Sequence, residues 1–118
     1  FTLAEIERIE RASAELHARC LDAVQHVITT RSYARLGIDP SLGPLIEATW
    51  EEEPPSLYGR FDLCVTDTAI SLYEYNADTP TSLFEAAVVQ WHWLERHAPG
   101  ADQYNRLHEA LVDTWRSF

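Results

Sequence analysis

Hydrophobic positions in the first part of the chain repeat at helical spacing. Apolar side chains return at steps of three or four residues, or multiples of them, and charged residues fill the positions between. This pattern predicts an amphipathic helix with one apolar stripe. The stripe consists of Leu3, Ile6, Ile9, Leu16, Cys20, Val24 and Val27. Thr2 and Glu5 have the spacing of a capping box, so we expect the helix to begin near Thr2.

Two shorter helical stretches follow this helix. Residues 33–36 form the first, and Gly37 reads as its stop signal. Residues 41–52 form the second, with Pro44 in its first turn, where the missing N–H is least costly. The Pro-Pro pair at 54–55 ends this second stretch.

Between residues 57 and 76 the apolar positions recur at every second residue instead. Two alternating runs, separated by the turn-forming residues 66–68, predict a β-hairpin. We expect the turn to be centred on Asp67. Directly opposed residues of paired strands project to the same face, so this register brings together four polar side chains near the strand ends. They are Arg60, Asp62, Glu74 and Asn76.

A further helix is predicted over residues 84–97. Pro80 suits its first turn, and Ser82 and Glu85 repeat the spacing of a capping box. The Pro-Gly pair at 99–100 stops this helix.

The last helix is expected after Asp102, which is placed to cap it. Its apolar residues recur at steps of three and four: Tyr104, Leu107, Leu111 and Trp115. The elements together predict an α+β fold in which a β-hairpin is packed by several helices. At 118 residues, the chain is expected to be one domain or part of one, over residues 1–118.

Charge narrows the classes of function. The chain has 9 basic and 19 acidic residues, a formal net charge of −10. Nucleic-acid binding depends on basic patches, so we expect no nucleic-acid partner. We also expect no membrane segment, because no apolar run approaches the length that spans a bilayer, and the start lacks the features of a signal peptide. A cytoplasmic location is the resulting expectation.

Residue types that commonly bind nucleotide phosphates are absent or scarce in the sequence. Lysine and methionine are absent, and the chain has only 4 glycines. A lysine and a glycine-rich loop are the usual cradle for nucleotide phosphates, so no complete ATP site can be read from these residues. A chain that begins with Phe1 and has no methionine is expected to be trimmed or excised from a longer one.

The polar group on the hairpin is the best candidate for chemistry. Two carboxylates and an amide oxygen are hard ligands of the kind that Mg²⁺ prefers. Arg60 beside them is a fork for a phosphate or a carboxylate. The alternative is a structural role, in which Arg60 and Glu74 form a cross-strand ion pair.

The position of two polar residues favours a ligand site. Ile70 and Leu72 define one face of the second strand, and Glu74 and Asn76 continue it. Burying a carboxylate is costly unless a cation compensates, so we interpret this strand end as a ligand site. The loop that follows leads to a helix N-terminus, whose free N–H groups attract anions.

Four segments of the chain carry a resemblance to a known family: residues 58–62, 72–83, 90–94 and 105–112. The segment from Glu74 to Ser82, with the order Glu-x-Asn-Ala-Asp-Thr-Pro-Thr-Ser, is the most specific. These segments resemble the glutathionylspermidine synthase family and its uncharacterised bacterial relatives. The resemblance covers the chain from Tyr58 to its end and is looser before.

The resemblance implies a fragment of a preATP-grasp/ATP-grasp ligase. Such enzymes use ATP to activate the glycine carboxylate of glutathione as an acyl phosphate, and join it to an amine such as spermidine. It implies that Arg60 is catalytic and contacts the phosphoryl group or carboxylate, with Asp62 also on the cofactor side. The implied Mg²⁺ ligands are Asp62, Glu74 and Asn76. The implied peptide-binding residues are Arg60, Thr79, Thr81 and Ser82.

The same resemblance implies a partner region. The ATP-grasp lobes with their nucleotide-binding lysines are not in this sequence, so we expect the isolated chain to bind metal weakly and to be inactive.

Two other readings stay open. One is a non-catalytic interaction or structural domain, in which the Arg, Asp, Glu and Asn side chains form a structural cluster. The other is a stand-alone Mg²⁺-dependent phosphate enzyme, for which the sequence offers no convincing nucleophile. Cys20 and Cys64 lack metal-type spacing and are expected to be reduced thiols.

Overall fold

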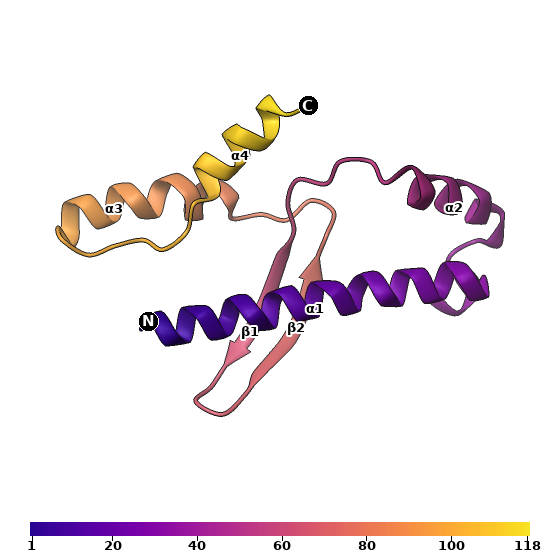
Figure 1. Ribbon diagram of the computed structural model, residues 1–118, viewed down its shortest axis with the longest axis horizontal. Coiled ribbons are helices and arrows are strands. Elements are labelled where there is room, and N and C mark those ends of the chain that lie inside the picture. Colours follow the sequence, from indigo (N-terminus) through magenta and orange to yellow (C-terminus); the bar gives the residue numbers. More distant parts are fainter. The chain divides into compact units, whose positions relative to one another are not determined.

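Helix α1 spans Leu3–Thr30 in a computed structural model that describes residues 1–118 (Figure 1). The predicted capping box is confirmed. The Thr2 N–H donates to the Glu5 carboxylate at 2.6 Å, and the Glu5 N–H donates to the Thr2 hydroxyl at 3.3 Å. Because the Thr2 N–H and hydroxyl stabilise the charged carboxylate, they lower the pKa of Glu5 from its ordinary value.

The two short helical stretches after α1 are also confirmed. The 3₁₀ helix η1 spans Tyr33–Leu36 and ends at Gly37, whose φ of 72° is in the left-handed region that glycine adopts freely. A second 3₁₀ helix, η2, spans Pro40–Leu42 and leads directly into helix α2 over Gly43–Glu52. The predicted helix over 41–52 is therefore divided into a 3₁₀ turn and an α-helix.

Side-chain hydrogen bonds tie α2 to the C-terminal end of α1 (Figure 1). Trp50 donates its indole N–H to Gln25 at 2.8 Å. Glu47 accepts from Arg31 at 3.1 Å and from the phenol of Tyr33 at 3.0 Å. Burial, and then the bond to Glu47, raises the pKa of Tyr33.

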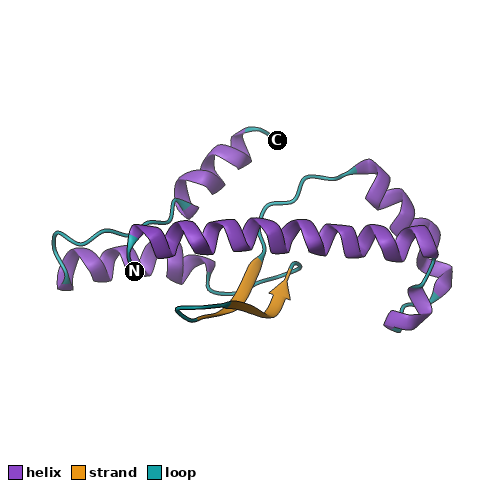
Figure 2. Ribbon diagram, turned by 60° about the horizontal axis from the view of Figure 1, so that its bottom comes forward, coloured by secondary structure: helices purple, strands orange, loops and turns teal.

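The predicted hairpin is present, with β1 over Arg60–Val65 and β2 over Ile70–Asn76 (Figure 2). The predicted centre of its turn, Asp67, is wrong by half a residue, because the turn is centred between Asp67 and Thr68. The Thr66 N–H donates to the Ala69 carbonyl at 2.9 Å, and the Ala69 N–H donates to the Thr66 hydroxyl at 3.0 Å. Thr66 therefore opposes Ala69, and Asp67 shares the tip with Thr68.

This turn sets a register that differs by one position from the predicted one. A side-chain hydrogen bond joins Tyr73 to Cys64, as expected for diagonal neighbours on one face in the observed register. It is also the main cause that raises the pKa of Tyr73. Asp62 shares this face with Cys64, two residues along the strand. The turn argument that grouped Asp62 with Glu74 therefore no longer holds, and the resemblance alone carries that grouping.

The helix predicted over 84–97 is present, but its start differs from the prediction. Ser82 has a φ of 75°, whereas an N-cap residue has extended backbone, so the expected capping box with Glu85 is wrong. Pro80 lies before the helix and not in its first turn. The helix begins at Leu83, widens into the π-helical turn η3 over Glu85–Val89, and continues as α3 over Gln90–His97.

The last helix, α4, spans Leu107–Arg116 and begins later than predicted. Asp102 does not cap it, because its carboxylate accepts the neighbouring N–H of Gln103 at 2.8 Å. Gln103 donates its side-chain amide to the Ala86 carbonyl at 2.7 Å, which holds this segment against the η3 turn. Asn105 accepts from the Leu107 N–H at 3.4 Å at the helix start.

The chain divides into two compact units. The first consists of Phe1–Ser56 and Phe61–Tyr73, and the second of Leu57–Arg60 and Glu74–Phe118. The hairpin is shared, since its turn belongs to the first unit and its open end to the second. The fold class is α+β, as predicted. None of the helices is long and apolar enough to cross a bilayer.

Candidate functional site

Arg60 and Thr81, two of the predicted site residues, are in direct contact in the second unit. The Arg60 Nη1 donates to the Thr81 hydroxyl at 3.0 Å and to the Thr81 carbonyl at 3.3 Å. They are 21 residues apart in sequence, on the first residue of β1 and in the loop after β2. The fold therefore joins the predicted catalytic arginine to the predicted substrate loop.

Tyr58 joins Arg60 and Thr81 in this group of contacts, although its side chain was not among the predicted site residues. Its phenol donates to the same Thr81 carbonyl at 3.1 Å. Tyr58 stands two residues before Arg60, so an extended backbone projects both side chains to the same side. That spacing was the available signal. The Thr81 carbonyl thus receives donors from two side chains.

This contact restricts the Arg60 side chain. Its guanidinium is a planar fork of five donors, suited to two parallel bonds with a carboxylate or a phosphate. Thr81 binds one terminal nitrogen and so restricts the rotation of the fork. Arg60 is half-buried, which strengthens its electrostatic effect relative to a fully exposed charge.

Glu74 and Asn76 lie at the end of β2, where their environments differ. Glu74 is exposed and Asn76 is half-buried. The interpretation that Glu74 occupies a buried face is wrong, so the cost of burying a carboxylate does not argue for a ligand there. Asn76 accepts the Asp78 N–H at 3.3 Å through its side-chain oxygen, which shapes the start of the loop.

The other two predicted loop residues are exposed to solvent. Thr79 has an exposed side chain in the loop between β2 and η3. Ser82 is exposed as well, and its carbonyl accepts the Ala86 N–H at 3.0 Å as the helix starts. Of the three predicted hydroxyl residues, Thr81 is the one bonded to Arg60.

Asp62 is half-buried in β1 and belongs to the first unit. No group of three or more His, Cys, Asp and Glu side chains is placed to hold a metal ion. The predicted ligand set of Asp62, Glu74 and Asn76 contains only two such residues, so this finding does not test it. The set stays a prediction. Both cysteines, Cys20 and Cys64, are free thiols.

A sequence model of one protein family matches residues 1–118, and its description is glutathionylspermidine synthase preATP-grasp. A Haemophilus influenzae protein named provisionally as an acid–amine ligase is 47% identical over 114 residues, or 95% of this chain. The bifunctional glutathionylspermidine synthetase/amidase of Escherichia coli is 31% identical over 96% of this chain. The glutathionylspermidine synthase of Crithidia fasciculata is 31% identical over 70% of it.

These relatives are much longer than the region they share with this chain. The matched region is 29% of the Haemophilus protein, 19% of the E. coli protein and 12% of the Crithidia protein. The chain therefore spans less than a third of each relative.

Proposed function

The chain belongs to the glutathionylspermidine synthase preATP-grasp family, and from this premise we propose that the longer protein carrying it is an ATP-dependent ligase. The ligase joins a glutathione-like peptide carboxylate to an amine such as spermidine. Relatives named as synthetases and as an acid–amine ligase support this class of reaction. The isolated chain is inactive, since it holds only the carboxylate side of the site.

The single observation that carries the proposal is the bond between Arg60 and Thr81. An ATP-dependent ligase must hold the carboxylate while negative charge develops during phosphoryl transfer, and a positioned guanidinium stabilises that charge. Arg60 performs this role. Thr81 orients the guanidinium, and together with Thr79 and Ser82 it lines the path of the peptide.

The chemistry of the donor set fits Mg²⁺. Asp62 and Glu74 offer carboxylate oxygens and Asn76 an amide oxygen, which are ligands that Mg²⁺ accepts. By the resemblance, which alone groups them, these three residues would hold the ion. When bound, Mg²⁺ neutralises charge on the phosphate oxygens. The nucleotide does not fit this chain, which has no lysine and 4 glycines, so ATP binding belongs to another part of the longer protein.

The test uses the full-length protein with ATP, Mg²⁺, glutathione and spermidine. Release of ADP that requires both the peptide and the amine, with an amide product of the expected mass, is the expected result. Omission of either substrate is the control. Isotope exchange between ATP and ADP with the peptide alone reports on formation of an acyl phosphate.

A second arm tests the metal set in the same protein. Glu74→Gln should raise the Mg²⁺ concentration needed for half-maximal activity, whereas Glu53→Gln, which removes an exposed carboxylate between α2 and β1, should not. If no pair of peptide and amine is turned over, the ligase proposal fails and the non-catalytic interaction domain is favoured. If Glu74→Gln leaves the Mg²⁺ dependence unchanged, the proposed metal set fails.

A further inference from the structure

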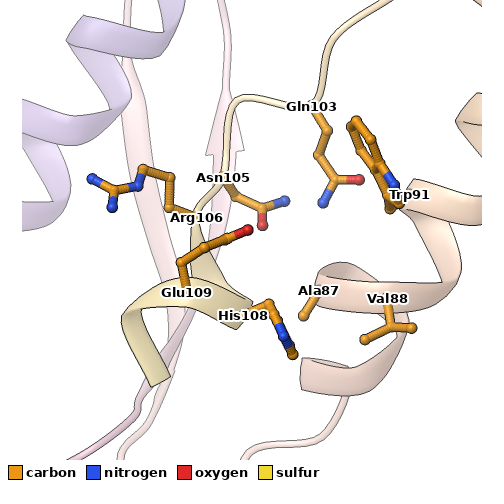
Figure 3. A pocket seen from close by; sticks show the side chains of 8 residues that line it. All are labelled: Ala87, Val88, Trp91, Gln103, Asn105, Arg106, His108 and Glu109. Atoms are coloured by element: carbon orange, nitrogen blue, oxygen red, sulfur yellow. The ribbon is translucent and has the colours of Figure 1, made fainter. Parts of the chain in front are cut away.

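A pocket of about 460 Å³ lies in the second unit, and none of the predicted site residues lines it (Figure 3). The π-helical turn η3 and the start of α3 form one side of it, and the segment before α4 with the first turn of α4 forms the other. The lining residues used below are Trp91, Gln103, Asn105, Arg106 and Glu109.

Gln103 presents an unsatisfied acceptor here. Its Nε2 donates to the Ala86 carbonyl at 2.7 Å. Two oxygens would repel each other at that distance, so the nitrogen must face the carbonyl and the orientation of the amide is determined. The remaining atom, Oε1, is buried and has no hydrogen-bond partner. A buried acceptor of this kind is costly unless a donor reaches it.

The backbone under the pocket is irregular at the residue that holds Gln103. In η3 the Gln90 N–H donates to the Glu85 carbonyl, five residues back, as in a π-helix. The Ala86 carbonyl in this turn accepts from Gln103 and, at 3.5 Å, from Asn105. Isolated π-helical turns are frequent at functional sites. Here the turn anchors the two amide side chains of the pocket.

The other groups of the pocket select the chemistry of a ligand. Glu109 offers an exposed carboxylate, and no ion pair or hydrogen bond is described for it. Trp91 offers a ring that is 42% exposed. Arg106 also lines the pocket, but Figure 3 shows its guanidinium pointing away from the other labelled side chains. The pocket thus combines an unpaired acceptor, the Glu109 carboxylate and an aromatic face, and the imidazole of His108 also lines it.

We propose that this pocket binds a small organic ammonium ion. The ammonium N–H groups satisfy Gln103 Oε1, the Glu109 carboxylate balances the positive charge, and Trp91 contacts the cation or its carbon chain. The net charge of −10 raises the local concentration of cations and favours this occupant over an anion. The inference does not rest on the proposed ligase activity, because it uses none of the same residues.

The experiment measures binding to the full-length protein without ATP, Mg²⁺ or peptide. The probes are n-butylammonium, the neutral 1-butanol and the anion butyrate, which share one alkyl chain. Calorimetry and saturation-transfer NMR are expected to show binding of n-butylammonium at least about tenfold tighter than that of 1-butanol, because only the ammonium is charged, and no binding of butyrate.

Variants locate this binding on the pocket. Glu109→Gln keeps the shape but removes the charge, and should weaken n-butylammonium binding about fivefold or more. Trp91→Leu should weaken it to a similar degree. Glu95→Gln, an exposed carboxylate on α3 outside the pocket, is the matched control and should leave binding unchanged.

Equal binding of n-butylammonium and 1-butanol would overturn the proposal. Unchanged affinity in both Glu109→Gln and Trp91→Leu would also overturn it, since the amine would then bind elsewhere in the protein. The ligase proposal is tested by turnover and is untouched by either result.

Discussion

Two arginines hold backbone carbonyls that adjoin the two ends of the hairpin, and they differ in what else they touch. Arg8 on α1 donates to the carbonyls of Thr66 and, at 2.9 Å, of Asp67 in the turn. Arg60 donates to the carbonyl of Thr81, but also to its hydroxyl. The first contact is made to main chain alone, whereas the second includes a side chain of the predicted substrate loop.

The comparison separates a structural arginine from the arginine that we propose acts in the reaction. Arg8 has a buried Nε without a partner, and its terminal nitrogens are used by the turn. Every amino acid has a backbone carbonyl, so this contact would form whatever the side chains of the turn. It fixes the position of the turn but does not depend on which residues form it. Thr81 provides a hydroxyl that a valine would lack, so the second contact depends on side-chain identity.

The largest expected effect is the loss of activity when the Arg60 side chain is removed. Arg60→Ala in the full-length protein should lower kcat by about 100-fold or more, the size of effect seen when one charge-stabilising donor is removed. Arg60→Lys should recover only part of the rate, because a lysine lacks the planar fork. Steady-state ADP release measures both.

Arg35→Ala is the matched control for that experiment, since it removes an exposed arginine in η1. It should change kcat by less than about twofold, as for surface substitutions in general. A rate near that of the unmodified protein in Arg60→Ala would contradict the assignment of Arg60.

The next effect tests the structural side. Arg8→Ala should lower the free energy of unfolding by about 1–3 kcal/mol, because two carbonyls of the turn lose a charged donor. Denaturant unfolding measures the loss, and faster amide exchange at Ala69 would locate it at the turn. The activity of the folded fraction at low temperature should be nearly unchanged. A large fall in kcat without a loss of stability would reverse the roles of the two arginines.

Thr81→Val sharpens the comparison with a smaller change. It removes the hydroxyl from Arg60 but keeps the backbone carbonyl, so kcat/KM should fall by about five- to tenfold, equivalent to one hydrogen bond. Thr79→Val, on the same loop but without a bond to Arg60, should have a smaller effect on kcat. Equal losses in the two variants would argue against orientation of Arg60 by Thr81.

The smallest effect concerns the start of the helix that carries Arg8. Hydrogen bonds from Thr2 lower the pKa of Glu5 below its ordinary value of 4.5. The capping box therefore contributes stability that is fully present above that value and is lost as the pH falls through the lower, folded value. NMR of the first-turn amides should show fraying over this acidic range. Glu5→Gln should remove this pH dependence, and an unchanged profile would contradict it.

Local chemistry made much of the fold predictable. The capping box of Thr2 and Glu5 needs only residues three apart, and the φ of 72° at Gly37 follows from its lack of a Cβ. The alternation of residues along 60–76 likewise determined that a hairpin forms. The position of its turn depends on a side-chain contact, because the Thr66 hydroxyl accepts the Ala69 N–H.

The errors lie where distant residues override local signals. Asp102 is a residue type that often caps helices. However, Gln103 donates to the Ala86 carbonyl 17 residues earlier, and the helix does not begin until Leu107. Glu74 continues an apolar pattern yet is exposed.

The candidate site was predictable in part. The resemblance selected both Arg60 and Thr81, but neither spacing nor composition indicated that they touch, because the loop geometry that brings them together is not encoded in a local pattern. The pocket around Gln103 was not predicted at all. Its lining comes from two segments whose pairing depends on one bond to the main chain.

The π-helical turn at Glu85–Val89 makes the second half of that helix sensitive to chain length. A wide turn accommodates one residue more than the α-helical repeat, and each residue of an α-helix advances about 100° around the axis. Deleting a single residue within η3 would let the turn tighten and rotate everything up to His97 by that angle. Trp91 would then leave the pocket while the helix itself survived, so a one-residue gap at this point would separate family members that can form the pocket from those that cannot.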